Sequence, residues 1–185
     1  MPPTDESIAA QVQQGDTEAF GVLVSRFEAK ISRYARKFLR VSEDREDLVQ
    51  EVFLKAFVNI KSFDTSRKFS PWLYRIAHNE FVNALKKGSR QPFQLFDFDT
   101  VLPHLAAPET ADKDAERREI SKEMETCLSE LDIKYREPLV LYYLEELSYE
   151  TIAEVLHIPI STVGVRMRRG KHRLKEIYEA TFGTL

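Results

Sequence analysis

Apolar residues recur every three or four positions along most of this chain, and no other feature limits its fold as strongly. Between residues 18 and 40, eight of them fall on one stripe: Phe20, Leu23, Val24, Phe27, Ile31, Tyr34, Ala35 and Phe38. This spacing places side chains on one face of an α-helix, whereas a half-buried strand needs strict alternation. Because alternation of that kind is sparse, the sequence predicts an all-α protein.

Capping residues predict where the next helices begin. A second helix follows Ser42 and has acids in its first turn, where they favour the helix dipole. A third begins at Ser70, with Pro71 at the first helical position. The second helix is expected to bury Leu48, Val49, Val52, Phe53, Ala56, Phe57 and Ile60. Three amphipathic helices can close one core, so residues 1–88 are predicted to form a helical domain.

Prolines and acids interrupt the pattern between residues 89 and 112. This segment holds four acids and one base, and its apolar side chains indicate that it packs against something. Helical periodicity then resumes over four segments: 113–130, Tyr135–Leu144, Tyr149–Leu156 and Thr162–Thr181. The prediction is therefore two small helical domains, 1–88 and 113–185, joined by an acidic linker, 89–112.

Composition excludes several classes of protein. The chain has 185 residues and a formal net charge of −3. Its lone cysteine, Cys127, rules out an internal disulfide, and its four scattered histidines show no pair at metal-ligand spacing, so no metal or cofactor is expected. The longest uncharged apolar run, Pro138 to Leu144, is far shorter than the roughly 20 residues of a membrane helix. The expected location is the cytoplasm, without membrane insertion.

The last two predicted helices have the spacing of a helix-turn-helix. Ser148 caps the first, Ala153 is small where the helices approach, residues 157–160 make the turn, and Ser161 caps the second. No acid lies between Ser161 and Lys175, where six basic residues occur. Such a basic helix face suits a DNA major groove, and the alternative is an ordinary helical hairpin with a solvated basic face. The outward residues are Thr162, Val165, Arg166, Arg169 and Arg173.

A second group of residues interleaves aromatic, basic and amide side chains near the end of the first domain. Its members are Lys61, Phe63, Arg67, Lys68, Phe69, Trp72, Tyr74, Arg75, Asn79 and Asn83. Aromatic rings stack on unpaired bases, cations bind phosphates and amides bind base edges, so the group suits single-stranded DNA. The polar loop from Ser62 to Lys68 can shape a pocket for a flipped base. Alternatively, Phe69, Leu73, Ala77 and Phe81 lie at helical spacing and form core.

Three segments of the chain, 44–57, 69–79 and 147–156, resemble bacterial sigma factors of the extracytoplasmic-function (ECF) class. The resemblance implies that the N-terminal domain binds core RNA polymerase and melts the minus 10 promoter element. It implies that the C-terminal domain reads the minus 35 element and that the linker threads the polymerase cleft. The implied partners are the beta-prime clamp and beta flap of the polymerase, promoter DNA and an anti-sigma factor, and no catalytic activity is expected.

The resemblance assigns the clamp-binding residues, and the residue patterns described above give those of the two promoter elements. The clamp-binding residues are Asp47, Leu48, Gln50, Glu51 and Phe53. The minus 10 residues are Lys61, Phe63, Asp64, Ser66, Arg67, Lys68, Phe69, Trp72, Arg75 and Asn79. The minus 35 residues are Ser161, Thr162, Val165, Arg166, Arg168, Arg169 and Arg173. The chain departs from the family at Gly164 and Val165, and at His157, which replaces a turn glycine and is expected to adopt a positive φ.

Two other functions are compatible with parts of the sequence. A stand-alone helix-turn-helix regulator would bind duplex DNA without polymerase, but it would leave the helix from Asp47 to Phe57 and the aromatic and basic group unexplained. A small enzyme such as a nuclease would need a convergent cluster of acids or a histidine pair, which the sequence lacks.

Overall fold

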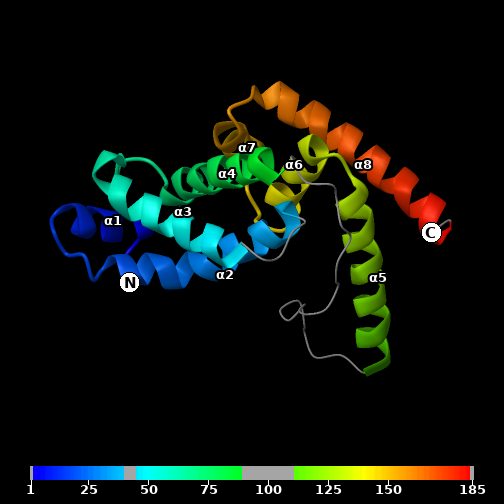
Figure 1. Ribbon diagram of the computed structural model, residues 1–185, viewed down its shortest axis with the longest axis horizontal. Helices are drawn as coiled ribbons and strands as arrows, with labels where there is room; N and C mark the ends of the chain where they lie inside the picture. The colour runs from blue at the N-terminus through cyan, green and yellow to red at the C-terminus, as the bar shows by residue number, and fades with distance from the viewer. Residues whose placement is uncertain (1, 40–44, 89–110, 184–185) are drawn as a thin grey trace.

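The computed structural model describes residues 2–39, 45–88 and 111–183, and over those ranges it contains helices and no strand. The prediction of an all-α fold is confirmed (Figure 1). The predicted linker lies outside the described residues except for its last two, which begin α5. The helices are α1 (Asp5–Gln13), α2 (Phe20–Phe38), α3 (Arg45–Asn59), α4 (Phe69–Gly88), α5 (Ala111–Glu130), α6 (Ile133–Tyr143), α7 (Tyr149–Leu156) and α8 (Ile160–Phe182), with a short 3₁₀ turn, η1, at Ile60–Ser62.

Helices α1 to α4 form the N-terminal unit around an aromatic core. Of the side chains proposed as core, Phe69, Leu73, Ala77 and Phe81 are all buried, which confirms the structural alternative for this part of α4. Phe57 was expected in the core, but it is 36% exposed, and its ring packs edge-on against Phe20 at 5.1 Å between centroids. One side of α3 therefore lies at the surface, and Phe57 is at its edge.

Helix α1 was not predicted from the sequence. Thr4 caps it, because the Thr4 hydroxyl oxygen accepts a hydrogen bond of 3.2 Å from the amide of Ser7, and Asp5 and Glu6 occupy the first turn. Only three of its nine residues are buried, namely Ile8, Ala9 and Val12. Three apolar positions on a short helix give a weak periodic signal.

Helices α5 to α8 form the C-terminal unit, in which α7 and α8 make the helix-turn-helix. Ser148 caps α7 as predicted, and His157 ends it with φ 52° and ψ 44°, which confirms the expected left-handed conformation. Helix α8 begins at Ile160 after Pro159, so Ser161 lies inside the helix and is not its cap. Gly170 lets α8 approach α6, because a Cβ there would lie 3.2 Å from the Tyr135 carbonyl oxygen.

The two units pack against each other rather than standing apart on a linker. Helix α4 contacts α7 and α2 contacts α6, so buried residues of both units belong to one continuous hydrophobic cluster. In Figure 1, α6 and α7 lie beside the N-terminal unit, whereas α8 and α5 extend away from it. Sequence periodicity predicted the helices but gave no indication of this contact.

Two buried glutamates of the C-terminal unit bind polar groups of the N-terminal unit. The first, Glu145, accepts two hydrogen bonds from the Arg33 guanidinium, at 2.7 Å from Nε and 2.9 Å from Nη2. The Tyr74 hydroxyl donates to the same carboxylate at 2.6 Å. Burial and the Glu145 charge raise the pKa of Tyr74 well above its ordinary value, so this phenol stays a donor. The charge of Glu145 is thus compensated by Arg33 across the contact between the two units, which we call the junction.

The second glutamate, Glu137, lies on α6 and is also buried. Its Oε1 atom accepts a hydrogen bond from the Tyr34 hydroxyl and lies 2.6 Å from His78 Nδ1. Burial and the Glu137 charge raise the pKa of Tyr34 well above its ordinary value. Nearby, Arg136 Nη2 donates to the Phe38 carbonyl oxygen at 3.1 Å. Arg136, Glu137 and Glu145 therefore each contact a polar group of the N-terminal unit.

Candidate nucleic-acid and partner-binding surfaces

The acidic and amide side chains of α3 form one candidate surface for a partner. Asp47 and Gln50 are exposed, and Glu51 is partly exposed with its carboxylate 3.5 Å from Lys55 Nζ. Leu48 is half-buried, whereas Phe53 is buried in the core and does not present its ring to a partner. The structure therefore brings four of the five proposed clamp residues to the surface and places the fifth behind them.

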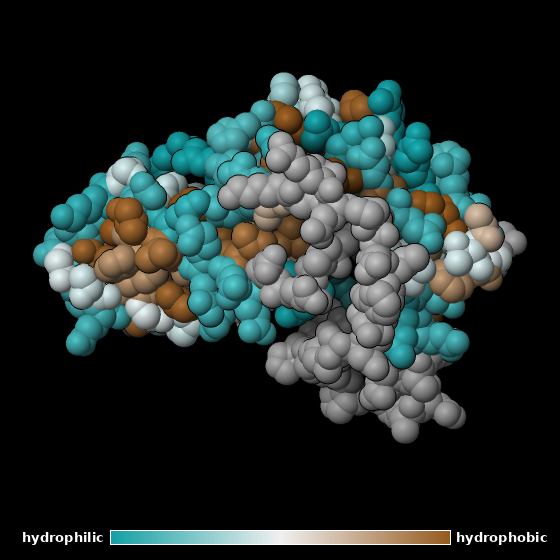
Figure 2. All heavy atoms as spheres, viewed as in Figure 1, coloured by the Kyte–Doolittle hydropathy of each residue, from teal (hydrophilic) through white to brown (hydrophobic). Residues whose placement is uncertain are grey.

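Exposed apolar side chains continue this α3 surface. Leu54 is 56% exposed and Val58 is 69% exposed, and both follow Glu51 at helical spacing, three and seven residues on. Figure 2 shows a hydrophobic area over the end of the N-terminal unit where α2 and α3 run together. Leu54 and Val58 were not predicted from the sequence because they lie outside the buried stripe of α3, although their spacing from Glu51 indicates a second stripe.

The segment from Ser62, the last residue of η1, to Lys68 is a short polar loop that leads into α4. Lys61, Asp64, Ser66, Arg67 and Lys68 are exposed, as a nucleic-acid contact requires. The loop turns on a local network, because Asp64 Oδ1 accepts hydrogen bonds from the Ser66 amide at 3.0 Å and the Ser66 hydroxyl at 2.7 Å. These two bonds hold the pKa of Asp64 below its ordinary value.

An open pocket of about 280 Å³ lies beside this loop, between α3 and α4. Three residues proposed from the sequence line it: Trp72, Arg75 and Asn79. The other lining residues are Lys55, Asn59, Ser62, Ile76 and Glu80, and Lys55 Nζ lies 2.6 Å from Glu80 Oε2. The residues that α3 contributes were not predicted from the sequence, although Lys55 and Asn59 are four positions apart and so share one helix face. The pocket thus combines an aromatic wall, cations and amides.

Three aromatic residues of the predicted group have other roles. Phe63 and Phe69 are buried, with their rings 5.5 Å apart, and Phe63 also lies 5.1 Å from the Trp72 ring. Tyr74 is buried and bonded to Glu145. None of these three presents a ring face on which a base could stack. The prediction that they contact DNA directly is therefore wrong, and their roles are structural. Trp72 is half-buried and reaches the pocket.

Helix α8 presents the basic face that the sequence predicted. Its buried stripe includes Val163, Met167 and Gly170. On the other side Ser161, Val165, Arg168, Arg169 and Arg173 are exposed, and Thr162 and Arg166 are half-buried. The helix-turn-helix therefore leaves a basic surface of the kind that enters a major groove.

Two of the proposed DNA-binding arginines already have partners in this structure. The Arg173 guanidinium lies over the Tyr135 ring, 5.6 Å from its centroid, and so packs against α6. Arg67 Nη2 lies 3.1 Å from Glu154 Oε2 of α7, which joins the polar loop to the helix-turn-helix by an exposed ion pair. An exposed pair of this kind contributes little to stability and can be exchanged for a phosphate.

Within the residues that the structure describes, no group of three or more histidine, cysteine, aspartate or glutamate side chains could hold a metal ion. Over the same part of the chain, no helix has the length and apolar character needed to cross a membrane.

Two protein-family models match this chain. One, Sigma-70 region 2, matches residues 23–91, which include most of α2, all of α3, the polar loop and α4. The other, Sigma-70 region 4, matches residues 121–174, which include α6, α7 and the first part of α8. The two matches therefore contain both candidate DNA-binding surfaces.

Curated relatives match over most of their length. The chain is 36% identical over 174 residues to the ECF RNA polymerase sigma factor SigW of Bacillus subtilis (strain 168), covering 90% of this chain and 92% of that protein. It is 32% identical over 180 residues to the ECF RNA polymerase sigma-E factor of Escherichia coli (strain K12), covering 92% of each.

A solved structure has the same arrangement of helices. CnrH, in complex with the cytosolic domain of CnrY, is similar with a TM-score of 0.74 and 27% identity, over 97% of this chain and 99% of that one. The sigma factor RpoE of Bartonella quintana, in complex with the anti-sigma factor NepR, shows the same fold at 22% identity with a TM-score of 0.69, over 88% of this chain and 98% of that one.

Proposed function

This chain belongs to the ECF class of RNA polymerase sigma factors, and from that premise we propose which of its surfaces bind the polymerase and which bind each promoter element. The protein binds core RNA polymerase and directs promoter-specific transcription initiation. We assign the minus 10 element to residues 1–88 and the minus 35 element to residues 113–185, with 89–112 as the linker between them. A stand-alone helix-turn-helix regulator would not need an exposed α3 surface, so this alternative function is not favoured.

The polar loop and the adjacent pocket capture a base of the non-template strand at the minus 10 element. One observation carries this proposal: Ser62, where the loop begins, lines a pocket together with Trp72, Arg75 and Asn79. The loop that continues from Ser62 exposes the polar side chains of Asp64, Ser66, Arg67 and Lys68. A base leaving the duplex loses its stacking and pairing, and an aromatic wall with amide and cationic groups replaces both. Opening of the promoter follows, because a captured base cannot pair again.

The exposed face of α3 binds the beta-prime clamp of core polymerase. Asp47, Gln50 and Glu51 supply acidic and amide groups, which complement a basic coiled coil, and Leu54 and Val58 supply apolar area on the same side of the helix. Phe53 supports this face from the core. Phe63 of the loop and Phe69 at the start of α4 are buried, and they have the same kind of supporting role for the minus 10 surface.

Helix α8 reads the minus 35 element as duplex DNA. Arg166 and Arg169 lie on its polar side near the N-terminal half, where a recognition helix contacts base edges, and Val165 is exposed beside them and can contact a thymine methyl. Arg168 and Arg173 supply charge toward the phosphates, and for Arg173 this requires release from the Tyr135 ring.

The other partners and properties follow from these assignments. An anti-sigma factor and the beta flap of polymerase complete the list of protein partners. Because the polymerase forms the phosphodiester bonds, this chain contributes binding and no catalysis of its own. It works where the polymerase works, in the bacterial cytoplasm.

Transcription reconstituted from purified components tests the proposal. Core polymerase alone, and core polymerase with this chain, are given a library of templates randomised at both promoter elements, and the transcripts are sequenced. We expect transcripts only with the chain present, and we expect the selected templates to share one motif near each element. Specific binding of the library by the chain without polymerase, together with no transcription, would instead indicate the stand-alone regulator.

A further inference from the structure

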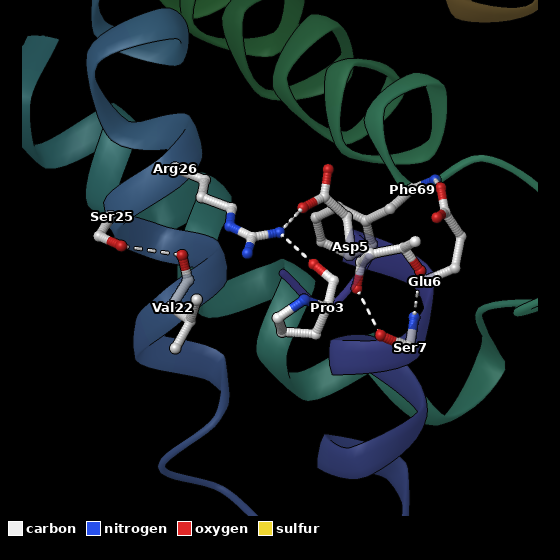
Figure 3. A network of polar contacts seen from close by, with 9 residues as sticks. Pro3, Asp5, Glu6, Ser7, Val22, Ser25, Arg26 and Phe69 are labelled. Atoms are coloured by element: carbon white, nitrogen blue, oxygen red, sulfur yellow. Dashed lines mark hydrogen bonds and ion pairs between the residues drawn. The ribbon is translucent and has the colours of Figure 1, made fainter. Parts of the chain in front are cut away.

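Side chains of α1 hold both ends of the polar loop. Gln13, the last residue of α1, donates from Nε2 to the Ile60 carbonyl oxygen and to the Phe63 carbonyl oxygen, each at 2.7 Å. Glu6, in the first turn of α1, accepts a hydrogen bond from the amide of Phe69 at 3.1 Å (Figure 3). The loop between these points therefore starts and ends on groups that α1 fixes.

The loop-side atoms in these bonds are main-chain atoms. The Phe69 amide is one of the donors at the start of α4 that have no partner within the helix, and Glu6 supplies one from 63 residues away. The Gln13 amide has two N–H groups, and it uses them on two carbonyls that are three residues apart. The contacts thus set the direction in which the chain enters and leaves the loop, independent of the loop side chains.

We propose that Glu6 and Gln13 are positioning residues for minus 10 recognition, which hold the main chain of the loop in the shape that accepts a flipped base of single-stranded DNA. The proposal rests on the function proposed above for the loop. It makes α1 part of the apparatus that reads the promoter, although α1 does not line the pocket. Helix α1 therefore affects binding of the DNA base only through the loop.

The charge state of Glu6 supports this role. Partial burial by itself would raise the pKa of Glu6, but hydrogen bonds from the main chain, of which the Phe69 amide gives the largest effect, and the charge of Lys68 outweigh it and hold the pKa below its ordinary value. Glu6 is therefore a carboxylate at neutral pH, and a carboxylate makes a stronger hydrogen bond to an amide than a neutral acceptor does.

A second polar contact of α1 supplies a matched control. Arg26 Nη1 of α2 lies 2.6 Å from Asp5 Oδ1 and 3.0 Å from the Pro3 carbonyl oxygen, so it ties α1 to α2 without involving the loop (Figure 3). If α1 only completes the core through Ile8, Ala9 and Val12, then weakening either contact has the same kind of effect. If α1 positions the loop, only Glu6 and Gln13 affect base choice.

The test uses holoenzyme made from core polymerase and the full chain carrying Gln13→Glu, Glu6→Ala, Glu6→Gln or Asp5→Asn, beside the loop variants Asp64→Ala and Ser66→Ala. Each holoenzyme selects from a pool of pre-melted bubble templates that differ only at the minus 10 positions. Affinity for core polymerase and the urea midpoint of the free chain are measured alongside. Gln13→Glu keeps the shape of the side chain but replaces the amide donor that faces the two carbonyls with a carboxylate oxygen, which can only accept. Glu6→Gln keeps one oxygen that can accept from the Phe69 amide. Should Gln13→Glu not fold, Gln13→Met replaces it.

We expect Gln13→Glu and Glu6→Ala to reduce the preference for the best minus 10 base about three- to tenfold, the effect of one or two hydrogen bonds. Affinity for core polymerase should not change. Glu6→Gln should restore most of the preference, and Asp5→Asn should lower the urea midpoint while leaving base choice as in the wild type.

Three results would overturn this proposal or its premise, and they can be told apart. Unchanged base choice in Gln13→Glu and Glu6→Ala, with a loss in loop variants at Asp64 and Ser66, would refute the positioning role and leave the function of the loop standing. An equal loss in Asp5→Asn would reduce α1 to a general structural role. If the loop variants themselves kept normal base choice, the function proposed for the loop would fail first.

Discussion

The two surfaces that we propose for DNA binding are built in different ways. In the N-terminal unit, a loop gains its shape from contacts with residues 47 to 63 positions away, and it stands on buried rings such as Phe63 and Phe69. In the C-terminal unit, the basic face of α8 follows from helical periodicity alone. The difference matches the targets, because an unpaired base needs an enclosing site whereas a duplex groove needs a rigid rod.

The largest expected effect concerns a surface that only the N-terminal unit has. Replacing Asp47 and Glu51 of α3 by arginine should abolish binding to core polymerase, since two reversed charges meeting a basic coiled coil cost several kcal/mol. Competition with the wild-type chain for core polymerase measures this, and circular dichroism should show unchanged helix content. A double variant that competes normally would remove α3 from the polymerase interface and with it this distinction between the units.

The next prediction tests how firmly the two units are joined. Glu145→Ala should lower the free energy of unfolding by about 2–3 kcal/mol, because it leaves the buried Tyr74 hydroxyl without an acceptor, whereas the Arg33 side chain is 39% exposed and can be hydrated. Urea denaturation measures the change. Glu154→Ala is the control: its ion pair with Arg67 also joins the units but is exposed, so it should cost about 1 kcal/mol or less. Equal effects would mean that the buried junction does not form in solution.

On α8, base reading and phosphate binding should separate. Alanine at Arg166 or Arg169 should cost about 1–3 kcal/mol and relax the preference at one or two minus 35 positions. Alanine at Lys171 or Lys175, further along α8, should weaken binding evenly across sequences and lower the salt slope by about one. Holoenzyme binding to a library of minus 35 variants at two salt concentrations distinguishes the two. An even loss for both arginines would show that α8 does not read sequence.

The last effect comes from pH acting on the junction, and it is absent at neutral pH. Burial and the charges of Glu137 and Glu145 raise the pKa values of Tyr34 and Tyr74, respectively, whereas a tyrosine in the unfolded chain has a pKa of about 10. Above that pH the unfolded chain releases protons that the folded chain keeps. Stability from these groups is therefore complete below about pH 10 and falls by about 1.4 kcal/mol per pH unit for each tyrosine above it.

The test compares variants because one lysine acts in the opposite direction. Burial and the neighbouring Arg36 charge lower the pKa of Lys37 to about 8, so its effect on stability is favourable as pH rises from about 8 to about 10.5. Urea midpoints of the wild type and of Tyr34→Phe with Tyr74→Phe, measured from about pH 9 to pH 11.5, isolate the phenols. A loss of stability above pH 10 equally steep in both proteins would contradict the assignment.

Sequence alone could predict the surfaces that depend on local order. The helix-turn-helix, the Ser148 cap, the strained turn at His157 and the exposed basic side of α8 all follow from residues within a few turns of one another. Exposure of Asp47 and Gln50 on α3 could be predicted for the same reason. Periodicity and capping carry such information because they reflect neighbours along one helix.

Contacts between distant segments could not be predicted in this way. Glu137 and Glu145 resemble solvated surface acids in the sequence, and Tyr74 resembles a DNA contact because it stands among aromatic and basic residues. The structure pairs Tyr74 with Glu145, 71 residues later, and places both in the junction. Phe63 and Phe69 were assigned to DNA for a similar reason, since a pattern of residue types does not say which rings the fold buries. The loop is thus where sequence reasoning needed the structure most.

The central claim is that the polar loop chooses the minus 10 base, and one measurement tests it most directly. Holoenzyme in which Asp64, Thr65 and Ser66 are all replaced by alanine is presented with pre-melted bubble templates randomised at the minus 10 positions, beside wild-type holoenzyme. The account predicts normal affinity for core polymerase and loss of preference at one or more of these positions, because capture of the base and not strand separation is the task of the loop. An unchanged pattern of preference in the triple variant would contradict the account.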